Sequence, residues 1–264
     1  MAHRVSRRQF ISGAALGAGA LAAGFWAPAI LRAAADDWAD LTGRFLYDGK
    51  APERKKLTVD KDVECCGKFD IRDESLMVAS DGSLKNVFVY VRSRNVEVHP
   101  DLEKSVPKRV TLDNRDCIFM PHCMTIWNAK QEFYIVNSDP VAQNVAYAPP
   151  LDTAANIVIP VGKDATWTFG RRQIVPVPIA CNYHPWESAY ILPRDDPYAA
   201  ISAKDGSFRI AKLPPGKLEF QVWHERVGYL DTPDWPKGRF ELTLRPGVND
   251  LGTIKLDPGK FEKK

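Results

Sequence analysis

The sequence has 264 residues and a formal net charge of +3 at neutral pH, with 36 basic and 33 acidic residues. Four of the arginines lie within the first 35 positions, and without them 32 basic residues face 33 acidic ones, so the rest of the chain is nearly neutral. A chain of this balance lacks the excess positive charge that nucleic-acid binding requires, and we expect no nucleic-acid partner. Its length leaves room for two domains of ordinary size.

The first 35 residues carry the features of an export signal. Residues 6–11 read Ser-Arg-Arg-Gln-Phe-Ile, which matches the twin-arginine signal, and a weakly apolar run rich in glycine and alanine follows from 13 to 29. Three alanines at 33–35 then supply a small-residue cleavage site. We therefore expect residues 1–35 to be a signal peptide, the mature protein to be periplasmic, and no membrane span to remain in it. The alternative is a single membrane anchor, which the glycines and Pro28 disfavour because about 20 strongly apolar residues are needed to span a bilayer.

Most of the remaining sequence is typical of short β-strands. Runs of β-branched and aromatic residues are bounded by Ser-Asp, Pro and Gly, and no helix-length pattern of period 3.6 follows the leader. We expect a domain boundary near 193–197, with strands before it at 86–91, 132–136, 165–169 and 175–181, and after it at 198–202, 208–210, 218–224, 240–244 and 250–256. This pattern predicts an all-β protein built from sandwiches.

Five cysteines, at positions 65, 66, 117, 123 and 181, are an odd number for an exported protein. At least one of them is expected to be free or to bind a metal, unless two chains are bridged. Vicinal cysteines rarely pair with each other, so we favour a disulfide between Cys66 and Cys117. It would close a loop of about 50 residues and stabilise the fold by about 4 kcal/mol in the chain-entropy model. The alternative is that Cys65, Cys66 and Cys117 are all reduced and buried.

A group of soft donors occupies residues 120–124, which read Met-Pro-His-Cys-Met. Thioether, imidazole and thiolate groups suit Cu(I), so Met120, His122, Cys123 and Met124 are candidates for a second metal site, and the chain is a candidate copper carrier. In a strand, however, Cys123 faces away from the other three, and their convergence on one ion would need a kink such as Pro121 could supply. The alternative is ordinary packing of these side chains.

A thiolate and an imidazole three residues apart occur in the stretch Cys-Asn-Tyr-His-Pro-Trp-Glu at 181–187. Together with Asn-Ser-Asp-Pro at 137–140, this loop resembles the cupredoxins, and within them most closely the amicyanin pattern Cys-x-x-His-Pro-Phe-Met. The segments at 204–208, 213–216 and 222–225 resemble a carboxypeptidase-regulatory-like domain of the transthyretin type. The resemblance implies two all-β domains: a cupredoxin-like Greek-key β-sandwich with an N-terminal strand extension at 36–193, and a small transthyretin-like β-sandwich at 194–258.

The resemblance also implies a type 1 copper site formed by His at 143, Cys at 181, His at 184 and Met at 187. This sequence keeps Cys181 and His184 but has Gln143 and Glu187 at the other two positions. Oxygen donors would stabilise an oxidised copper ion or suit zinc, rather than a rapid electron shuttle. We therefore expect an atypical copper site that serves metal binding, or electron transfer with a redox partner protein.

An alternative without metal stays open. Cys181 is also a candidate for a packed thiol or for a disulfide with Cys123, which would leave a metal-free scaffold or a binding module for a protein or glycan partner. The sequence contains no Gly-rich phosphate loop, no Gly-x-Ser-x-Gly motif and no His-Glu-x-x-His helix, so we expect no enzyme activity.

Overall fold

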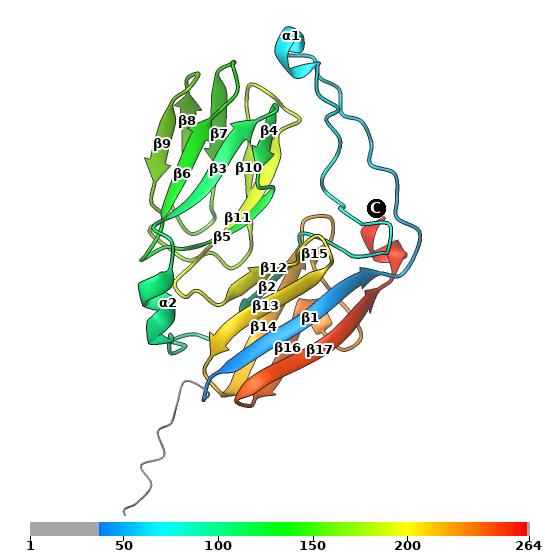
Figure 1. The fold of residues 1–264 in the computed structure, drawn as a ribbon, viewed down its shortest axis with the longest axis vertical. Coiled ribbons are helices and arrows are strands. Elements are labelled where there is room, and N and C mark those ends of the chain that lie inside the picture. The colour runs from blue at the N-terminus through cyan, green and yellow to red at the C-terminus, as the bar shows by residue number, and fades with distance from the viewer. Residues whose placement is uncertain (1–36, 263–264) are drawn as a thin grey trace, which may run out of the picture. The chain divides into compact units, whose positions relative to one another are not determined.

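The fold is built from β-strands, as the sequence predicts. The computed structural model describes residues 37–262, so the predicted signal peptide at 1–35 lies outside the described residues. Within residues 37–262 the strands form four sheets (Figure 1), and the all-β class is confirmed. No helix in this described range is long and apolar enough to cross a membrane.

The first pair of sheets encloses a core of its own. One sheet has the strand order β4-β3-β6-β9 and the other β5-β11-β10-β7-β8. Burial alternates along β6, which places Phe133 and Ile135 in the core between the sheets. The strands are β3 (Arg109–Arg115), β4 (Ile118–Met120), β5 (Cys123–Trp127), β6 (Glu132–Asn137), β7 (Gln143–Tyr147), β8 (Ala155–Ile159), β9 (Asp164–Trp167), β10 (Val177–Ala180) and β11 (Ser188–Arg194).

The second pair of sheets has a separate core. One sheet has the strand order β13-β1-β17. The other has the order β12-β2-β14-β15, and its fifth strand, β16, also pairs with β14. Every second residue of β1 is buried, so Leu41 and Phe45 pack into this core. The strands are β1 (Ala39–Tyr47), β2 (Phe88–Val91), β12 (Ala199–Ile201), β13 (Ser207–Leu213), β14 (Gly216–His224), β15 (Gly228–Tyr229), β16 (Arg239–Leu244) and β17 (Gly247–Leu256).

The second pair of sheets combines strands from both ends of the described chain. β1 pairs in parallel with β17 and antiparallel with β13, and β2 pairs antiparallel with β14. Two strands that precede residue 92 therefore hydrogen-bond to strands that follow residue 198. The domain limits of 36–193 and 194–258 stay predictions. A further buried cluster contains Phe88 and Trp223 from the second pair of sheets together with Cys123 and Leu192 from the first.

Short helical segments punctuate the connections between strands. The one that matters for the site is α1 (Val63–Cys66), which lies in the long connection between β1 and β2 and is coloured cyan in Figure 1. Its residue Cys66 packs with Cys117 and Ile71 in a small apolar cluster that Trp186 joins, next to one end of the first pair of sheets. The other segments are α2 (Pro100–Ser105), η1 (Pro236–Gly238) and η2 (Pro258–Phe261).

Candidate metal centre

Residues 181–187 form the tight connection between the antiparallel strands β10 and β11. Ala180 pairs with Ser188, and the amide of Glu187 donates to the carbonyl of His184 at 2.9 Å. The amide of His184 donates to Sγ of Cys181 at 3.3 Å. These contacts fold the loop so that the ligand atoms of Cys181, His184 and Glu187 lie within 4.8 Å of one another.

Gln143 adds a fourth donor from the first position of β7, which pairs with β10. Its Oε1 lies 2.9 Å from Nδ1 of His184 and 3.5 Å from Sγ of Cys181. Sγ of Cys181 lies 3.7 Å from Nδ1 of His184, which in turn lies 3.2 Å from Oε1 of Glu187. All four residues that the sequence indicates for the metal site are thus brought together, and their binding of a metal stays a prediction.

The cluster is sealed from solvent. Gln143 and His184 are fully buried, Glu187 is 1% exposed and Cys181 is 3% exposed. Burial raises the pKa of Glu187 because a carboxylate charge loses its hydration, although His184 and Gln143 act against this shift. One oxygen of that carboxylate, Oε2, has no hydrogen-bond partner among the described residues. A buried carboxylate oxygen without a partner is costly, so it points to a group that the described chain does not supply.

An acidic residue that is distant in the sequence contacts His184 on the side of the ring that faces away from the cluster. Oδ2 of Asp62, the residue that precedes α1, lies 2.8 Å from Nε2 of His184, so the imidazole presents Nδ1 to the cluster. Burial opposes a charge on this ring, but hydrogen bonds to Cys181, Glu187 and Asp62 outweigh it and raise the pKa of His184 to about 10. No sequence pattern indicates Asp62, because it lies in a loop without a motif and only the fold brings it next to His184.

Gln143 is also oriented by a second residue that sequence reasoning missed. Its Nε2 donates to Oδ2 of Asp139 at 2.9 Å and to Oε1 of Glu187 at 3.1 Å. Both donations fix the amide so that Oε1 faces Cys181 and His184. Asp139 is itself buried and accepts from the amide of Cys117. Asp139 belongs to the Asn-Ser-Asp-Pro segment at 137–140, which is recognisable in the sequence. The sequence did not indicate that Asp139 contacts Gln143.

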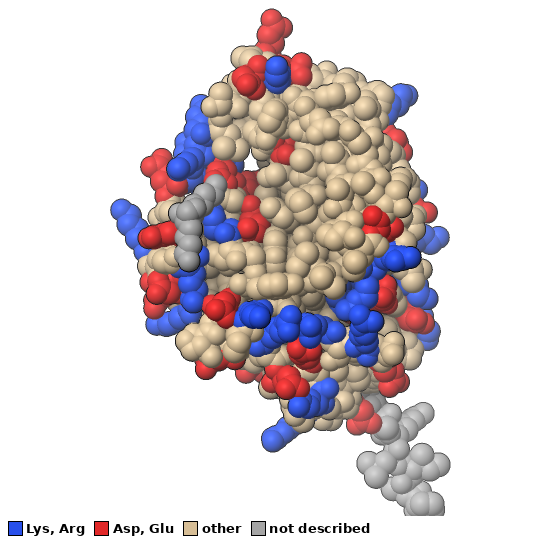
Figure 2. All heavy atoms as spheres, turned by 180° about the vertical axis from the view of Figure 1, so that it is seen from behind, with Lys and Arg blue, Asp and Glu red and all other residues tan. Residues whose placement is uncertain are grey.

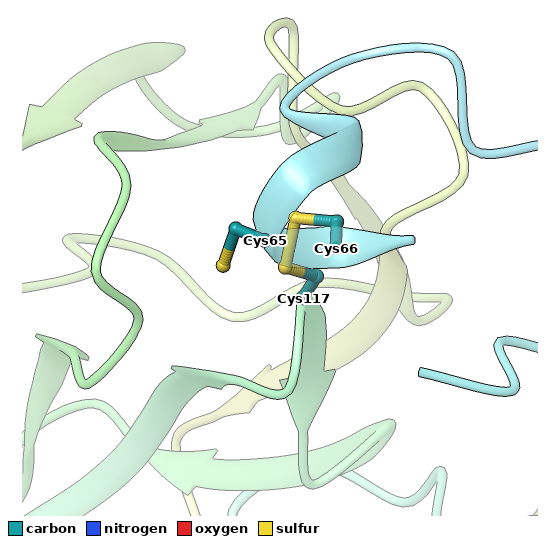
Figure 3. A group of neighbouring side chains, drawn as sticks. All are labelled: Cys65, Cys66 and Cys117. Carbon is teal, nitrogen blue, oxygen red and sulfur yellow. A yellow bond between two sulfur atoms is a disulfide. The ribbon is translucent and has the colours of Figure 1, made fainter. Parts of the chain in front are cut away.

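A disulfide joins Cys66 of α1 to Cys117, and the free thiol of Cys65 lies beside it (Figure 3). The carbonyl of Cys117 accepts from Nε1 of Trp186 at 2.9 Å, so the disulfide, α1 and the 181–187 loop are connected. This connection anchors Asp62 next to His184. Cys123 and Cys181 are both free, and the disulfide between them that the sequence left open is not formed.

His122, Cys123 and Glu225 form another cluster, with ligand atoms within 4.8 Å of one another. Nε2 of His122 bonds Oε2 of Glu225, and its Nδ1 lies 3.7 Å from Oε2 of Glu74. Burial opposes a charge on His122, but Glu225 and Glu74 outweigh it and raise its pKa, whereas burial raises the pKa of Cys123. We interpret this cluster as a buried ion pair beside a protonated thiol.

The methionines on either side do not join this cluster. Met124 packs in the core of the first pair of sheets, whereas Cys123 packs in the cluster shared by the two pairs. Sδ of Met120 accepts from Nη2 of Arg115 at 3.5 Å. The four soft donors at 120–124 therefore do not share one location, because Met120 belongs to β4, and Cys123 and Met124 are adjacent residues of β5 that face opposite sides of the sheet.

Comparison with known proteins gives structural likeness only. No family model and no curated protein matches the chain. Amicyanin from Paracoccus versutus is 15% identical, with 40% of this chain and 97% of amicyanin covered at a TM-score of 0.29. A purple cupredoxin from Nitrosopumilus maritimus is 14% identical, with coverages of 33% and 100% and a TM-score of 0.27. A copper-containing nitrite reductase from Thermus scotoductus SA-01 is 17% identical, with coverages of 33% and 23% and a TM-score of 0.27. At these identities and scores the likenesses establish neither the family nor the function of this chain.

The expectation that the chain is not an enzyme is corrected by these comparisons. One of the similar structures, the nitrite reductase, is itself an enzyme, although the chain covers only 23% of it and no activity is shown for this chain. Phosphate-loop, nucleophile-elbow and zinc-helix motifs are absent from the sequence. A copper oxidoreductase needs none of these motifs, so their absence does not exclude enzyme activity.

Proposed function

We propose that this protein binds one copper ion at Cys181, His184, Glu187 and Gln143, and that it is an exported, cupredoxin-like metal-binding protein. The observation that carries the proposal is the convergence of four different donor side chains, from a loop and a neighbouring strand, all of them buried. Thiolate and imidazole are donors that copper accepts readily, and the two oxygens complete a four-donor set.

The spacing of the donors around Cys181 fits a small four-coordinate ion. Metal–ligand bonds of 2.0–2.3 Å place tetrahedral ligands roughly 3.3–3.8 Å apart. The distances of 3.5 Å and 3.7 Å from Sγ of Cys181 to Gln143 and His184 fall in this range, and the 3.2 Å between His184 and Glu187 lies just below it. The 2.9 Å between Oε1 of Gln143 and Nδ1 of His184 is a hydrogen-bond distance, so these two groups must move apart by a few tenths of an ångström to hold a metal together. The unpartnered Oε2 of Glu187 is a further donor at the same place. Asp62 behind His184 is the kind of carboxylate support that metal-binding histidines commonly have.

The donor set favours stable binding of the metal over electron transfer. A bound copper ion would supply redox chemistry, and soft axial ligands are what usually make that chemistry fast and reversible. Here Glu187 and Gln143 offer oxygen, which favours the oxidised ion and would lower the reduction potential. A rapid electron shuttle is thus the less favoured role, and zinc is the main competitor for the same donors.

The competing interpretation is a metal-free scaffold or binding module. Hydrogen bonds already connect Asp62, His184, Gln143 and Asp139, and such a network could serve packing alone. This network leaves Oε2 of Glu187 without a hydrogen-bond partner among the described residues, and this observation favours the metal-binding interpretation over the scaffold. Export to the periplasm through the twin-arginine route and a redox partner protein remain parts of the proposal that rest on the sequence.

Titration of the metal-free mature protein with Cu(II) and Zn(II) tests the proposal. We expect one tightly bound copper per chain, with an intense thiolate-to-copper absorption band that is lost in Cys181→Ser. Cys123→Ser is the matched control, since Cys123 is also free and buried, and it should keep both the band and the stoichiometry. Absence of stoichiometric metal would favour the scaffold, and copper lost only in Cys123→Ser would favour the carrier.

A further inference from the structure

Five arginines line a cleft that lies apart from the metal centre. The cleft has a volume of about 340 Å³, and it is lined by Arg92, Arg94, Arg172, Arg194 and Arg239, with Glu219 as the one acidic residue. These residues come from the segments around β2, β11, β14 and β16 and from the loop before β10. Charged side chains are unevenly spread on the molecule: Figure 2 shows Lys and Arg, with Asp and Glu between them, in a band across the lower half of one face, below a largely uncharged region.

We propose that this cleft binds a small organic anion that carries a phosphate or carboxylate group. The proposal is independent of the metal centre. Its first support is the charge of the lining, which is positive by four units if every guanidinium and the single carboxylate are counted. Unpaired charges in a partly desolvated cleft are costly, so a ligand of opposite charge gains affinity by compensating them.

The protein compensates only part of this charge. Glu219 holds Arg92 through both carboxylate oxygens, at 2.9 Å and 2.7 Å from Nη1. Asp196 accepts from Nη2 of Arg194 at 3.1 Å. Within residues 37–262, no carboxylate lies within ion-pair distance of Arg94, Arg172 or Arg239. Nε of Arg239 donates to Oε1 of Gln221 at 3.3 Å, and Asp195 and Asp196 act on Arg172 only from beyond contact distance.

The second support is the state of Arg194. Its side chain is 1% exposed, and its Nε and Nη1 have no hydrogen-bond partner among the described residues. The guanidinium lies over the ring of Tyr90, 5.2 Å from its centroid, and Tyr90 also lines the cleft. A guanidinium has five donors in a fixed plane, and a buried one normally satisfies most of them. Because Arg194 is one of the residues that line the cleft, these two unpartnered donors lie beside it, where an oxyanion would satisfy them.

The electrostatics of Arg172 agree with this arrangement. Burial lowers the pKa of Arg172, and the like charge of Arg194 lowers it further, although Asp195 and Asp196 act in the opposite direction. A bound anion would relieve both the repulsion and the lost hydration. Arg94 adds to the repulsion, which indicates that these guanidinium groups share one electrostatic environment.

The chemistry of the lining selects the class of ligand. Guanidinium groups bind carboxylate and phosphate oxygens through paired hydrogen bonds, and they do so better than ammonium groups. The volume lies at the lower end of the range for small-molecule pockets, so it fits a compact ligand with an apolar portion against Tyr90 and Tyr229. Neutral and cationic ligands are disfavoured by the same charge.

The test is binding of inorganic phosphate and of succinate to the metal-free mature protein by calorimetry, at constant ionic strength with chloride as the background anion. We expect saturable binding of at least one of the two at one site per chain. Phosphate binding would assign the phosphate-bearing class and succinate binding the carboxylate-bearing class. Arg172→Gln should weaken that binding at least tenfold and should fold, because Arg172 is only half-buried and makes no ion pair.

Two control variants separate this site from other effects. Arg245→Gln removes the same charge from an exposed position outside the cleft and should leave the affinity unchanged. Cys181→Ser should bind the anion normally whether or not the protein binds copper, so failure of one proposal is distinguishable from failure of the other. Saturable binding of neither anion, or equal weakening by Arg172→Gln and Arg245→Gln, would overturn the proposal.

Discussion

Oδ2 of Asp62 lies 2.8 Å from Nε2 of His184, although 122 positions separate the two residues in the chain. The contact fixes the ring so that Nδ1 faces Sγ of Cys181 and Oε1 of Gln143. A carboxylate in this position raises the basicity of a metal-binding imidazole and sets its orientation. The connection that carries α1 is therefore part of the candidate metal centre.

Replacing this carboxylate tests its supporting role. Asp62→Asn keeps the shape of the side chain but weakens the bond to His184, so copper affinity should fall by about 10–100-fold. Asp60→Asn, an exposed aspartate two residues earlier in the same connection, is the matched control and should leave the affinity unchanged. Competition with a chelator of known affinity measures both. Equal affinity of Asp62→Asn and wild type would mean that the contact has no part in metal binding.

The disulfide between Cys66 and Cys117 should stabilise both the fold and the metal centre. Removing it in the double variant Cys66→Ala/Cys117→Ala should lower the free energy of unfolding by about 4 kcal/mol, because the unfolded chain loses the constraint of a long loop. The same variant should bind copper more weakly, since α1 and Asp62 are no longer tied to the first pair of sheets.

Cys65→Ser is the control for the disulfide variant. Cys65 is adjacent in sequence and only half-buried, and its thiol is free. Urea unfolding and copper titration of Cys65→Ser should resemble those of wild type. A loss in Cys65→Ser as large as that in the double variant would contradict the assignment of the stabilising bond to Cys66 and Cys117.

Two glycines with left-handed backbone offer a matched test of packing in the second pair of sheets. Gly206 has φ of +76°, and a Cβ there would lie 2.4 Å from the carbonyl oxygen of Phe45. Gly162 has φ of +64° with open space around it. Both Ala variants incur backbone strain, but only Gly206→Ala adds a clash with β1, so it should be less stable than Gly162→Ala by about 1–3 kcal/mol. Chemical denaturation compares them, and equal losses would contradict the pairing of β1 with the 203–207 turn.

The pH dependence of stability should carry a contribution from His224. Burial, together with the positive charges of Arg226 and His122, lowers the pKa of this ring to about 3. An unfolded chain takes up this proton near pH 6.5, so between about pH 6.5 and 3 the unfolded state binds more protons and stability falls as the pH falls. His224→Gln should remove a slope of about 1.4 kcal/mol per pH unit in that window. Urea unfolding at several pH values measures it, and an unchanged slope would contradict the prediction.

Local sequence patterns were sufficient for part of the strands and part of the site, whereas β3, β5, β8 and β11 were not predicted. The runs at 132–136 and 218–224 correspond to β6 and β14: β6 alternates as a half-buried strand does, whereas the last five residues of β14 are all buried, so a continuous buried run marks it. The Cys-x-x-His spacing likewise placed Cys181 and His184 in one tight loop. Both features depend on residues that are close together in the chain.

The remaining features depend on contacts that no local pattern encodes. Asp62 reaches His184, and Glu225 reaches His122, only because separate strands pair in the folded chain. The five arginines of the cleft are spread from residue 92 to residue 239 and form no motif. The parallel pairing of β1 with β17 joins segments about 200 residues apart, which periodicity cannot predict.

X-ray absorption spectroscopy of the copper-loaded mature protein tests the central claim most directly, because it reports the atoms bound to the metal. We predict one sulfur neighbour together with nitrogen and oxygen neighbours, and loss of the sulfur in Cys181→Ser but not in Cys123→Ser. A copper ion without a sulfur neighbour in wild type, or one that keeps its sulfur in Cys181→Ser, would contradict a metal centre at Cys181, His184, Glu187 and Gln143.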